Sequence, residues 1–211
     1  MANVLLGVTG SVAAIMTPPL FDAMKQAGHQ VKIVATRSSL YFFDPATLDG
    51  VDGKRNKDVV LLDEDEWPGQ RWQRGDPVLH IELRRWANVL VIAPLDANTL
   101  AKLALGMCDN CLTCVWRAWD RTRPVILAPA MNTLMWEHPA TGRHLRQIAA
   151  DLGTEPPVAL PLLDLADWIN GQLPKLRIVA PISKRLACDD VGLGAMAGVA
   201  DIVSTVEAVS N

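Results

Sequence analysis

The sequence predicts an α/β protein in which helices cover both faces of a parallel β-sheet. Short runs rich in valine, isoleucine and leucine alternate along the chain with longer amphipathic stretches, as expected when strands and helices alternate. The short runs are apolar at nearly every position, which is typical of strands buried on both faces. A length of 211 residues suits one domain with a substantial core.

The elements can be assigned in order along the chain. The strand candidates are residues 4–8, 31–35, 59–62, 89–93, 125–128 and 177–180. The helix candidates are residues 12–27, 76–87, 97–119, 137–152 and 198–209. Pro18 and Pro19 are expected to restart the first helix behind a Thr17 cap. The proline-containing segment 154–176 predicts a loop with one short helix around 162–170, which either covers a functional site or packs on a neighbour.

Composition narrows the class of protein. The formal net charge of −3 argues against nucleic acid as a partner. No apolar run reaches the length of a bilayer span and no signal peptide is visible, so we expect a cytoplasmic protein without a membrane partner. In that reducing compartment the cysteines are expected to be thiols.

Three cysteines, Cys108, Cys111 and Cys114, form a C-x-x-C-x-x-C run. A bacterial iron–sulfur motif needs a fourth cysteine followed by proline, which this run lacks. The run also lies within the helical pattern 97–119, where buried cysteine behaves as a small hydrophobic residue. No metal site is therefore predicted.

Polar loops containing glycine or proline follow four of the predicted strands. They are GVTGSVAA (7–14), TRSS (36–39), APLDANTL (93–100) and PAMNTLMW (129–136). Ligands of open parallel sheets bind at the carboxyl ends of the strands, so these loops predict a cofactor with a phosphate and a polar ring. The G-x-G-x-x-G fingerprint is absent, which disfavours a standard dinucleotide site.

Individual polar residues in and around these loops also have simpler structural interpretations. Asp96 and Asn132 each precede a predicted helix and suit an N-cap, with the methionines around Asn132 as core filler. His80 lies early in an amphipathic helix, as a surface histidine would. Cys188 precedes a glycine-containing turn. Taken one at a time, these residues do not identify a site.

Together the motifs resemble the homo-oligomeric flavin-containing cysteine decarboxylases, and within them those that act on 4′-phosphopantothenoylcysteine. The segments that carry this resemblance are GSVAA (10–14), HIELRRWA (80–87), APLDANTLAK (93–102), CDN (108–110), PAMNTLMWEHP (129–139) and LACDDVGLGAMA (186–197). The resemblance implies a single-domain, Rossmann-like (flavodoxin-like) three-layer fold with a lid or insertion region at about 154–197. It also implies FMN and a homotrimer, or a multiple of trimers, with the active site between subunits.

The activity that the resemblance implies is FMN-dependent oxidative decarboxylation of 4′-phosphopantothenoylcysteine to 4′-phosphopantetheine, in coenzyme A biosynthesis. Direct loss of carbon dioxide would leave an unstabilised carbanion. In the family's mechanism FMN first takes a hydride from the thiol-bearing carbon, and the thioaldehyde then acts as the electron sink. The resulting enethiol is reduced by the flavin and protonated, so that the cofactor supplies the redox chemistry and the protein supplies position and protons.

The resemblance also assigns the site residues. The phosphate and ribityl contacts fall on Gly10, Ser11, Val12, Thr36, Ser38 and Ser39, and the ring and ribityl contacts on Asp96, Ala97, Asn98, Thr99 and Ala130. The catalytic residues are His80 and the proton donor Cys188. Asn132 binds the substrate carboxylate, an amide otherwise expected to lack a protein partner. Met131, Met135 and Trp136 would wall the pocket and pack the trimer contact.

Two departures from the family pattern keep alternatives open. The family usually has Cys-Gly-Asp where this chain has Cys188-Asp189-Asp190, and segment 154–176 is longer than in compact members. One alternative is therefore a decarboxylase of peptides with a C-terminal cysteine, which releases an aminoenethiol and does not need Cys188. A phosphatase-regulating binding subunit and a plain FMN-binding oxidoreductase fit the motifs less well.

Overall fold

The computed structural model describes residues 1–67, 69–71, 73–185 and 191–210. Its centre is a sheet in which every neighbouring pair of strands is parallel. The strand order is β3 (Val60–Leu62), β2 (Gln30–Ala35), β1 (Asn3–Val8), β4 (Val89–Leu95), β5 (Val125–Pro129) and β6 (Leu176–Ile178). This 3-2-1-4-5-6 order is that of a doubly wound Rossmann sheet, with its switch point between β1 and β4. The predicted fold class is confirmed.

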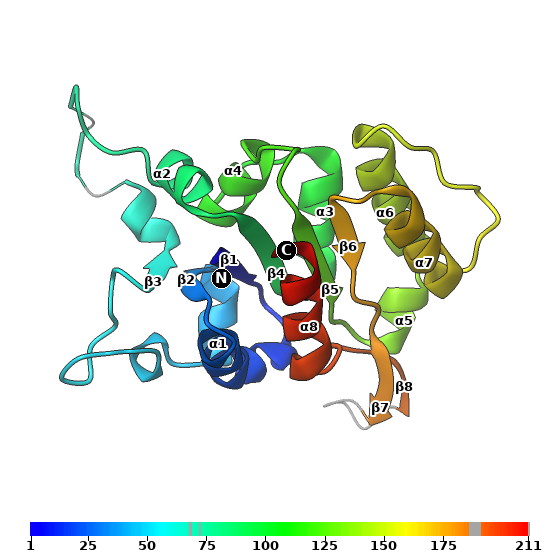
Figure 1. Cartoon of the computed structure of the whole chain (residues 1–211), viewed down its shortest axis with the longest axis horizontal. Helices are drawn as coiled ribbons and strands as arrows, with labels where there is room; N and C mark the ends of the chain where they lie inside the picture. The colour runs from blue at the N-terminus through cyan, green and yellow to red at the C-terminus, as the bar shows by residue number, and fades with distance from the viewer. Residues whose placement is uncertain (68, 72, 186–190, 211) are drawn as a thin grey trace.

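Two groups of helices make the outer layers (Figure 1). On one face lie α1 (Thr17–Gln26) and α8 (Val199–Ser210), which pack against each other. The other face carries α2 (Leu79–Trp86), α3 (Ala97–Leu105), α4 (Cys111–Arg117), α5 (Thr133–Glu137), α6 (Pro139–Asp151) and α7 (Leu162–Gln172). Short 3-10 helices occupy Val12–Met16 (η1), Arg37–Tyr41 (η2), Pro45–Thr47 (η3) and Asp63–Glu66 (η4).

Alternation along each strand divides the core into two clusters. Leu6 and Val8 of β1 face the α1 and α8 side, together with Phe21 and Ile202. Leu5 faces the opposite side, which holds the larger cluster. Both faces of β1 are therefore buried, which explains why its sequence is apolar throughout.

The predicted helix 97–119 is wrong as a single element. Helix α3 ends at Gly106, whose φ of 67° lies in the left-handed region that glycine adopts without penalty. Helix α4 then begins behind Asn110, whose side chain accepts a hydrogen bond from the Thr113 N–H at 2.9 Å. Local capping outweighs a hydrophobic period that runs on through both helices.

Other boundaries also differ from the prediction. The first helix is split into η1 and α1, but Thr17 is the first residue of α1 and makes no side-chain cap. Segment 162–172 forms α7, whose Leu165, Ala166 and Ile169 are buried in the core. This part of the longer segment therefore packs on its own chain.

The sequence analysis missed an antiparallel hairpin of β7 (Ile182–Arg185) and β8 (Val191–Ala195). In Figure 1 this hairpin lies beside α5, beyond the carboxyl end of β5. None of the helices among the described residues is long and apolar enough to cross a bilayer.

Candidate cofactor and substrate site

The site begins at the switch point of the sheet, where the ends of β1 and β4 are joined through Thr9. The Thr9 N–H and hydroxyl both donate to the Pro94 carbonyl oxygen, at 3.3 and 2.7 Å. The same hydroxyl accepts a hydrogen bond from the Asp96 N–H at 2.8 Å. Since Thr9 is fully buried, this network fixes the two loops relative to each other.

At Gly10 the loop after β2 meets the loops after β1 and β4. A methyl group at Gly10 would lie 2.5 Å from Oγ and 2.7 Å from Cβ of Ser38, and 3.3 Å from Oδ2 of Asp96. The loops after β1, β2 and β4 therefore converge on a residue that has no room for a side chain. Such a close approach of backbone to neighbouring polar groups is one of the uses of glycine at ligand sites.

Hydroxyl groups line the loops after β1 and β2. Ser11 caps η1, with its Oγ accepting from the Ala13 N–H at 3.3 Å. The hydroxyls of Thr36 and Ser38 lie 3.2 Å apart. Ser39 is fully buried and donates to the Thr36 carbonyl oxygen at 2.6 Å, so its side chain shapes the turn.

The start of α3 supplies the next polar groups. Asp96 caps the helix, because its Oδ1 accepts from the Thr99 N–H at 2.6 Å. Thr99 is buried, whereas Asn98 is exposed and Ala97 is half-buried. The cap holds Asp96 beside Gly10 and leaves Asn98 accessible at the edge of the sheet.

Asn132 follows the end of β5. The Ala130 N–H donates to the Leu95 carbonyl oxygen at 2.9 Å, which joins this loop to the end of β4. The Asn132 Oδ1 accepts from the Leu134 N–H at 2.9 Å and caps α5. The expectation that this amide lacks a protein partner is therefore wrong; the cap instead fixes its orientation.

The apolar residues around Asn132 divide into core and surface. Trp136 is only 1% exposed and belongs to the core of its own chain, so the expectation that it walls the pocket or packs a subunit contact is wrong. Met131 is also buried, whereas Leu134 and Met135 are 75% and 49% exposed. Of the three residues expected to wall the site, only Met135 presents a large exposed surface.

The β7–β8 hairpin packs directly on the loop that carries Asn132. The Met131 N–H donates to the Gly194 carbonyl oxygen at 2.9 Å. A methyl group at Gly194, whose φ is +151°, would lie 2.2 Å from the Met131 oxygen, and one at Gly192 would lie 2.4 Å from Oγ1 of Thr133. Cys188 and Asp189, between the two strands, lie outside the described residues.

His80 is held by a carboxylate that the sequence analysis missed. Its Nδ1 lies 2.5 Å from Oε1 of Glu66, and its backbone N–H donates to Oε2 at 3.1 Å. Glu66 is 3% exposed. A carboxylate at Nδ1 makes this nitrogen the donor, so that Nε2 is the ring's acceptor when the imidazole is neutral. Glu66 lies in the acidic run DEDE (63–66), which gives no local sign of burial.

The cysteine run lies beside this carboxylate. Asp63 accepts from the backbone N–H groups of Arg37 and Cys111, both at 3.3 Å, and burial raises its pKa. Burial, with the nearby Glu66 charge, raises the pKa of the Cys111 thiol far above its usual range. Cys111 is therefore a protonated core thiol. In the part of the chain that the structure describes, no three His, Cys, Asp or Glu side chains are placed to hold a metal ion.

Comparisons with known proteins match the whole chain. The model of the Flavoprotein family matches residues 1–211. Phosphopantothenoylcysteine decarboxylase of Arabidopsis thaliana is 48% identical over 206 residues, covering 97% of this chain and 83% of that protein. A solved mutant PPC decarboxylase complexed with pantothenoylaminoethenethiol is 46% identical with a TM-score of 0.75, covering 98% of this chain and 96% of that one. The FMN binding protein AtHal3 is 47% identical with a TM-score of 0.74, covering 98% and 95%.

Proposed function

The chain belongs to the Flavoprotein family, and from that premise we propose that it is an FMN-dependent carboxy-lyase of coenzyme A biosynthesis. Its reaction is the decarboxylation of 4′-phosphopantothenoylcysteine to 4′-phosphopantetheine. The observation that carries the proposal is the convergence of four strand ends, in which Gly10 lies against Ser38 and Asp96 while Ala130 bonds to the end of β4. Relatives that cover nearly the whole chain at 46–48% identity act on the same class of substrate by name.

FMN is the cofactor, and the residues at the switch point fit it. Because Gly10 has no side chain, the Ser38 hydroxyl lies close to the turn after β1, and the hydroxyls of Ser11 and Ser38 suit phosphate oxygens as donors. We assign the phosphate and ribityl contacts to Gly10, Ser11, Val12, Thr36, Ser38 and Ser39, and the remaining contacts to Asp96, Ala97, Asn98, Thr99 and Ala130. When bound, FMN supplies the two-electron oxidation and reduction that accompany decarboxylation.

Asn132 binds the substrate carboxylate in this proposal. Its Oδ1 accepts a hydrogen bond from the Leu134 N–H at 2.9 Å. An amide holds a carboxylate without adding charge, and the cap presets its direction. The exposed side chain of Met135, one turn further along α5, contacts the apolar part of the substrate.

His80 and Cys188 handle protons. With Nδ1 bonded to Glu66, His80 presents Nε2 as a base or a hydrogen-bond acceptor toward substrate. Cys188 is the proton donor for the last step; this role rests on the sequence motif alone. The lid that the sequence places at about 154–197 is limited here to the β7–β8 hairpin, since α7 packs in the core.

We further propose that the chain forms a homotrimer, or a multiple of trimers, in the cytoplasm. Exposed apolar side chains lie on η1 and α5, next to the proposed site: Val12, Ile15, Met16, Leu134 and Met135. Exposed apolar side chains such as these favour contact with another subunit. Light scattering of the purified holoprotein tests this, and a monomer would contradict it.

The decisive experiment incubates the FMN-loaded protein with 4′-phosphopantothenoylcysteine and identifies the product by mass spectrometry. Loss of carbon dioxide alone, without net change in hydrogen, is the expected result. Loss of carbon dioxide plus two hydrogens, with bleached flavin, would restrict the chain to the oxidative half of the reaction. No turnover would contradict the proposed substrate.

A peptide with a C-terminal cysteine is the control substrate, since Asp189 departs from the family motif. The longer segment 154–176 no longer favours this alternative, because its helix α7 is part of the core. Turnover of the peptide but not of the small molecule would replace the proposed function. Turnover of neither would favour a non-enzymatic role such as phosphatase regulation.

A further inference from the structure

A cavity of about 340 Å³ lies at the edge of the sheet opposite to the proposed active site. Its lining comes from the starts of β5 and β6 and from the C-terminal ends of α3, α4, α6 and α7 or the loops that follow them. In a doubly wound fold these are the amino ends of the strands, whereas cofactor and substrate bind at the carboxyl ends. The cavity is therefore separate from the flavin site. Its volume falls within the range of about 300–1,000 Å³ usual for small-molecule pockets.

The interior of the cavity is apolar and aromatic. Leu103, Ile148 and Leu176 are almost fully buried, and Trp116 and Trp119 add two indole rings. Both indole N–H groups are satisfied by backbone oxygens, at 3.1 Å from Leu103 and 3.3 Å from Arg123. Because the rings have no free polar group to offer, this interior suits the apolar body of a ligand.

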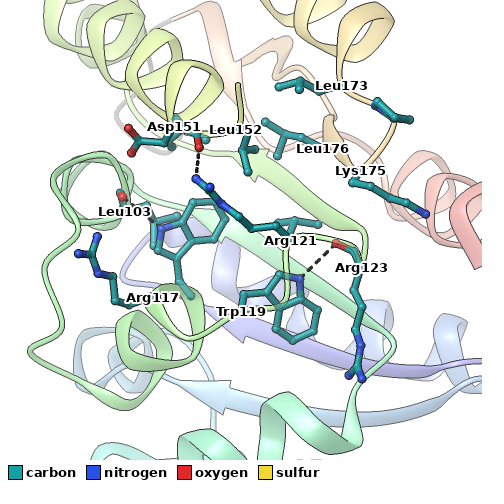
Figure 2. A pocket seen from close by; sticks show the side chains of 14 residues that line it. Leu103, Arg117, Trp119, Arg121, Arg123, Asp151, Leu152, Leu173, Lys175 and Leu176 are labelled. Carbon is teal, nitrogen blue, oxygen red and sulfur yellow. Dashed lines mark hydrogen bonds between the residues drawn. The ribbon is translucent and has the colours of Figure 1, made fainter. Parts of the chain in front are cut away.

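The rim of the cavity is cationic although the chain is acidic overall. Arg117, Arg121, Arg123 and Lys175 contribute to the lining, against one carboxylate, Asp151. Figure 2 shows Arg121 extending between Leu152 and Trp119 toward Asp151. The carboxylate of Asp151 accepts from Gln147 at 2.8 Å, and no ion pair joins it to these cations among the described residues.

Backbone carbonyl oxygens at helix ends accept hydrogen bonds from only some of these cationic side chains. Arg123 donates to the Arg84 and Ala87 carbonyl oxygens at 2.8 and 2.7 Å, at the end of α2, and is 3.7 Å from Asp120. Arg121 donates to the Asp151 carbonyl oxygen, which leaves most of its N–H donors available. In the described part of the chain the side chains of Arg117 and Lys175 have neither a hydrogen bond nor an ion pair.

We propose that this cavity binds an organic anion with an apolar body, of which a medium-chain carboxylate is the simplest example. The apolar part enters between the indoles and Leu176, and the anionic head pairs with Arg121, which crosses the cavity in Figure 2. Burial of the apolar part supplies affinity, and the guanidinium of Arg121 supplies selectivity for negative charge. The site is independent of the decarboxylase reaction, so its test does not depend on turnover.

The test is calorimetric titration of the FMN-loaded full-length protein with octanoate and, separately, with octylammonium, which has the same chain and the opposite charge. We expect saturable binding of octanoate, one per chain, and much weaker binding of octylammonium. Equal binding of the two, or no saturable binding of octanoate, would overturn the proposal.

Variants of the cavity lining test whether octanoate binds in this cavity. Arg121→Gln is expected to weaken octanoate binding at least about tenfold, the effect of one lost charge-assisted hydrogen bond. Arg143→Gln, which removes an exposed arginine of α6 outside the lining, is the matched control and should bind as the parent does. Leu152→Trp keeps every charge but fills the cavity, and should abolish binding. Unchanged affinity for octanoate in both Arg121→Gln and Leu152→Trp would place octanoate elsewhere and overturn the proposal.

Discussion

The carboxylate of Glu66 makes two contacts with His80: Oε1 lies 2.5 Å from Nδ1, and Oε2 accepts a hydrogen bond from the backbone N–H at 3.1 Å. The two residues lie 14 positions apart, one on η4 and one in the first turn of α2. Since Glu66 is almost fully buried, water solvates its carboxylate only weakly. The contact therefore fixes both the ring's position and the nitrogen that carries the proton.

Replacing Glu66 with glutamine tests this positioning role. Glutamine keeps the size of the side chain but removes the charge that favours a proton on Nδ1. We expect kcat for decarboxylation to fall about 10- to 100-fold, as when other oriented histidines lose their carboxylate partner, with little change in KM and an altered pH dependence of kcat. Glu64→Gln, two residues away on η4 and exposed, is the control. A purely structural Glu66 would instead lower thermal stability and leave the pH profile unchanged.

Asn132→Asp separates helix capping from substrate binding. Aspartate caps as well as asparagine, so the bond from the Leu134 N–H and the stability of the protein should be retained. A carboxylate facing the substrate carboxylate should lower kcat/KM at least about 100-fold, because juxtaposed like charges cost several kcal/mol. Steady-state kinetics and thermal unfolding measure the two effects. Unchanged kcat/KM would remove Asn132 from the substrate site.

Gly10→Ala tests the convergence of the three loops. The new methyl group would lie 2.7 Å from Cβ of Ser38, a contact that rotation of the serine hydroxyl cannot relieve. We expect the purified variant to lose most of its flavin, measured as the ratio of flavin to protein absorbance.

The matched control is Gly171→Ala, because a methyl group at Gly171 meets nothing within 4 Å and the residue lies within α7. This control should keep its flavin and gain about 0.5–1 kcal/mol of stability. Full flavin content in Gly10→Ala would contradict the assigned cofactor site.

The three cysteines of the run 108–114 should react with an alkylating reagent at different rates. Cys108 is exposed and Cys111 is 1% exposed. Burial and the Glu66 charge raise the pKa of Cys111, so its thiolate is depleted at neutral pH and alkylation is slow. Iodoacetamide treatment followed by peptide mass spectrometry should show Cys108 modified first and Cys111 last. In the control variant Cys108→Ser, the fastest phase of labelling should disappear. Rapid labelling of Cys111 in the folded protein would contradict its burial.

Local signals in the sequence determined most of the secondary structure. The runs that became β1, β2, β4 and β5 are apolar because both of their faces are covered, and this constraint is visible within a few residues. Side-chain caps such as Asp96 are equally local, since the cap and the N–H it serves are three residues apart. The polar character of four strand ends predicts a cofactor site at this edge of the sheet.

Where two local signals competed, the sequence alone was not enough to choose the right one. The apolar period through 97–119 continues across Gly106 and Asn110, and the periodicity outweighed the two capping residues in the prediction. Asn132 had two interpretations, and the structure supports the cap while leaving its proposed substrate role to experiment. The β7–β8 hairpin was missed because its glycine-rich strands offer little hydrophobic alternation.

Tertiary structure alone decided which distant residues meet. The order of the strands places Gly10 against Ser38 and Asp96, buries Glu66 beside His80 and sets the hairpin on the loop of Asn132 through Gly194. It also creates the cationic cavity at the opposite edge from four helix ends and two strand starts. Secondary structure follows from backbone and side-chain preferences that act within one or two turns of chain. A site depends on contacts between strand ends, and only the packing of the whole sheet fixes those.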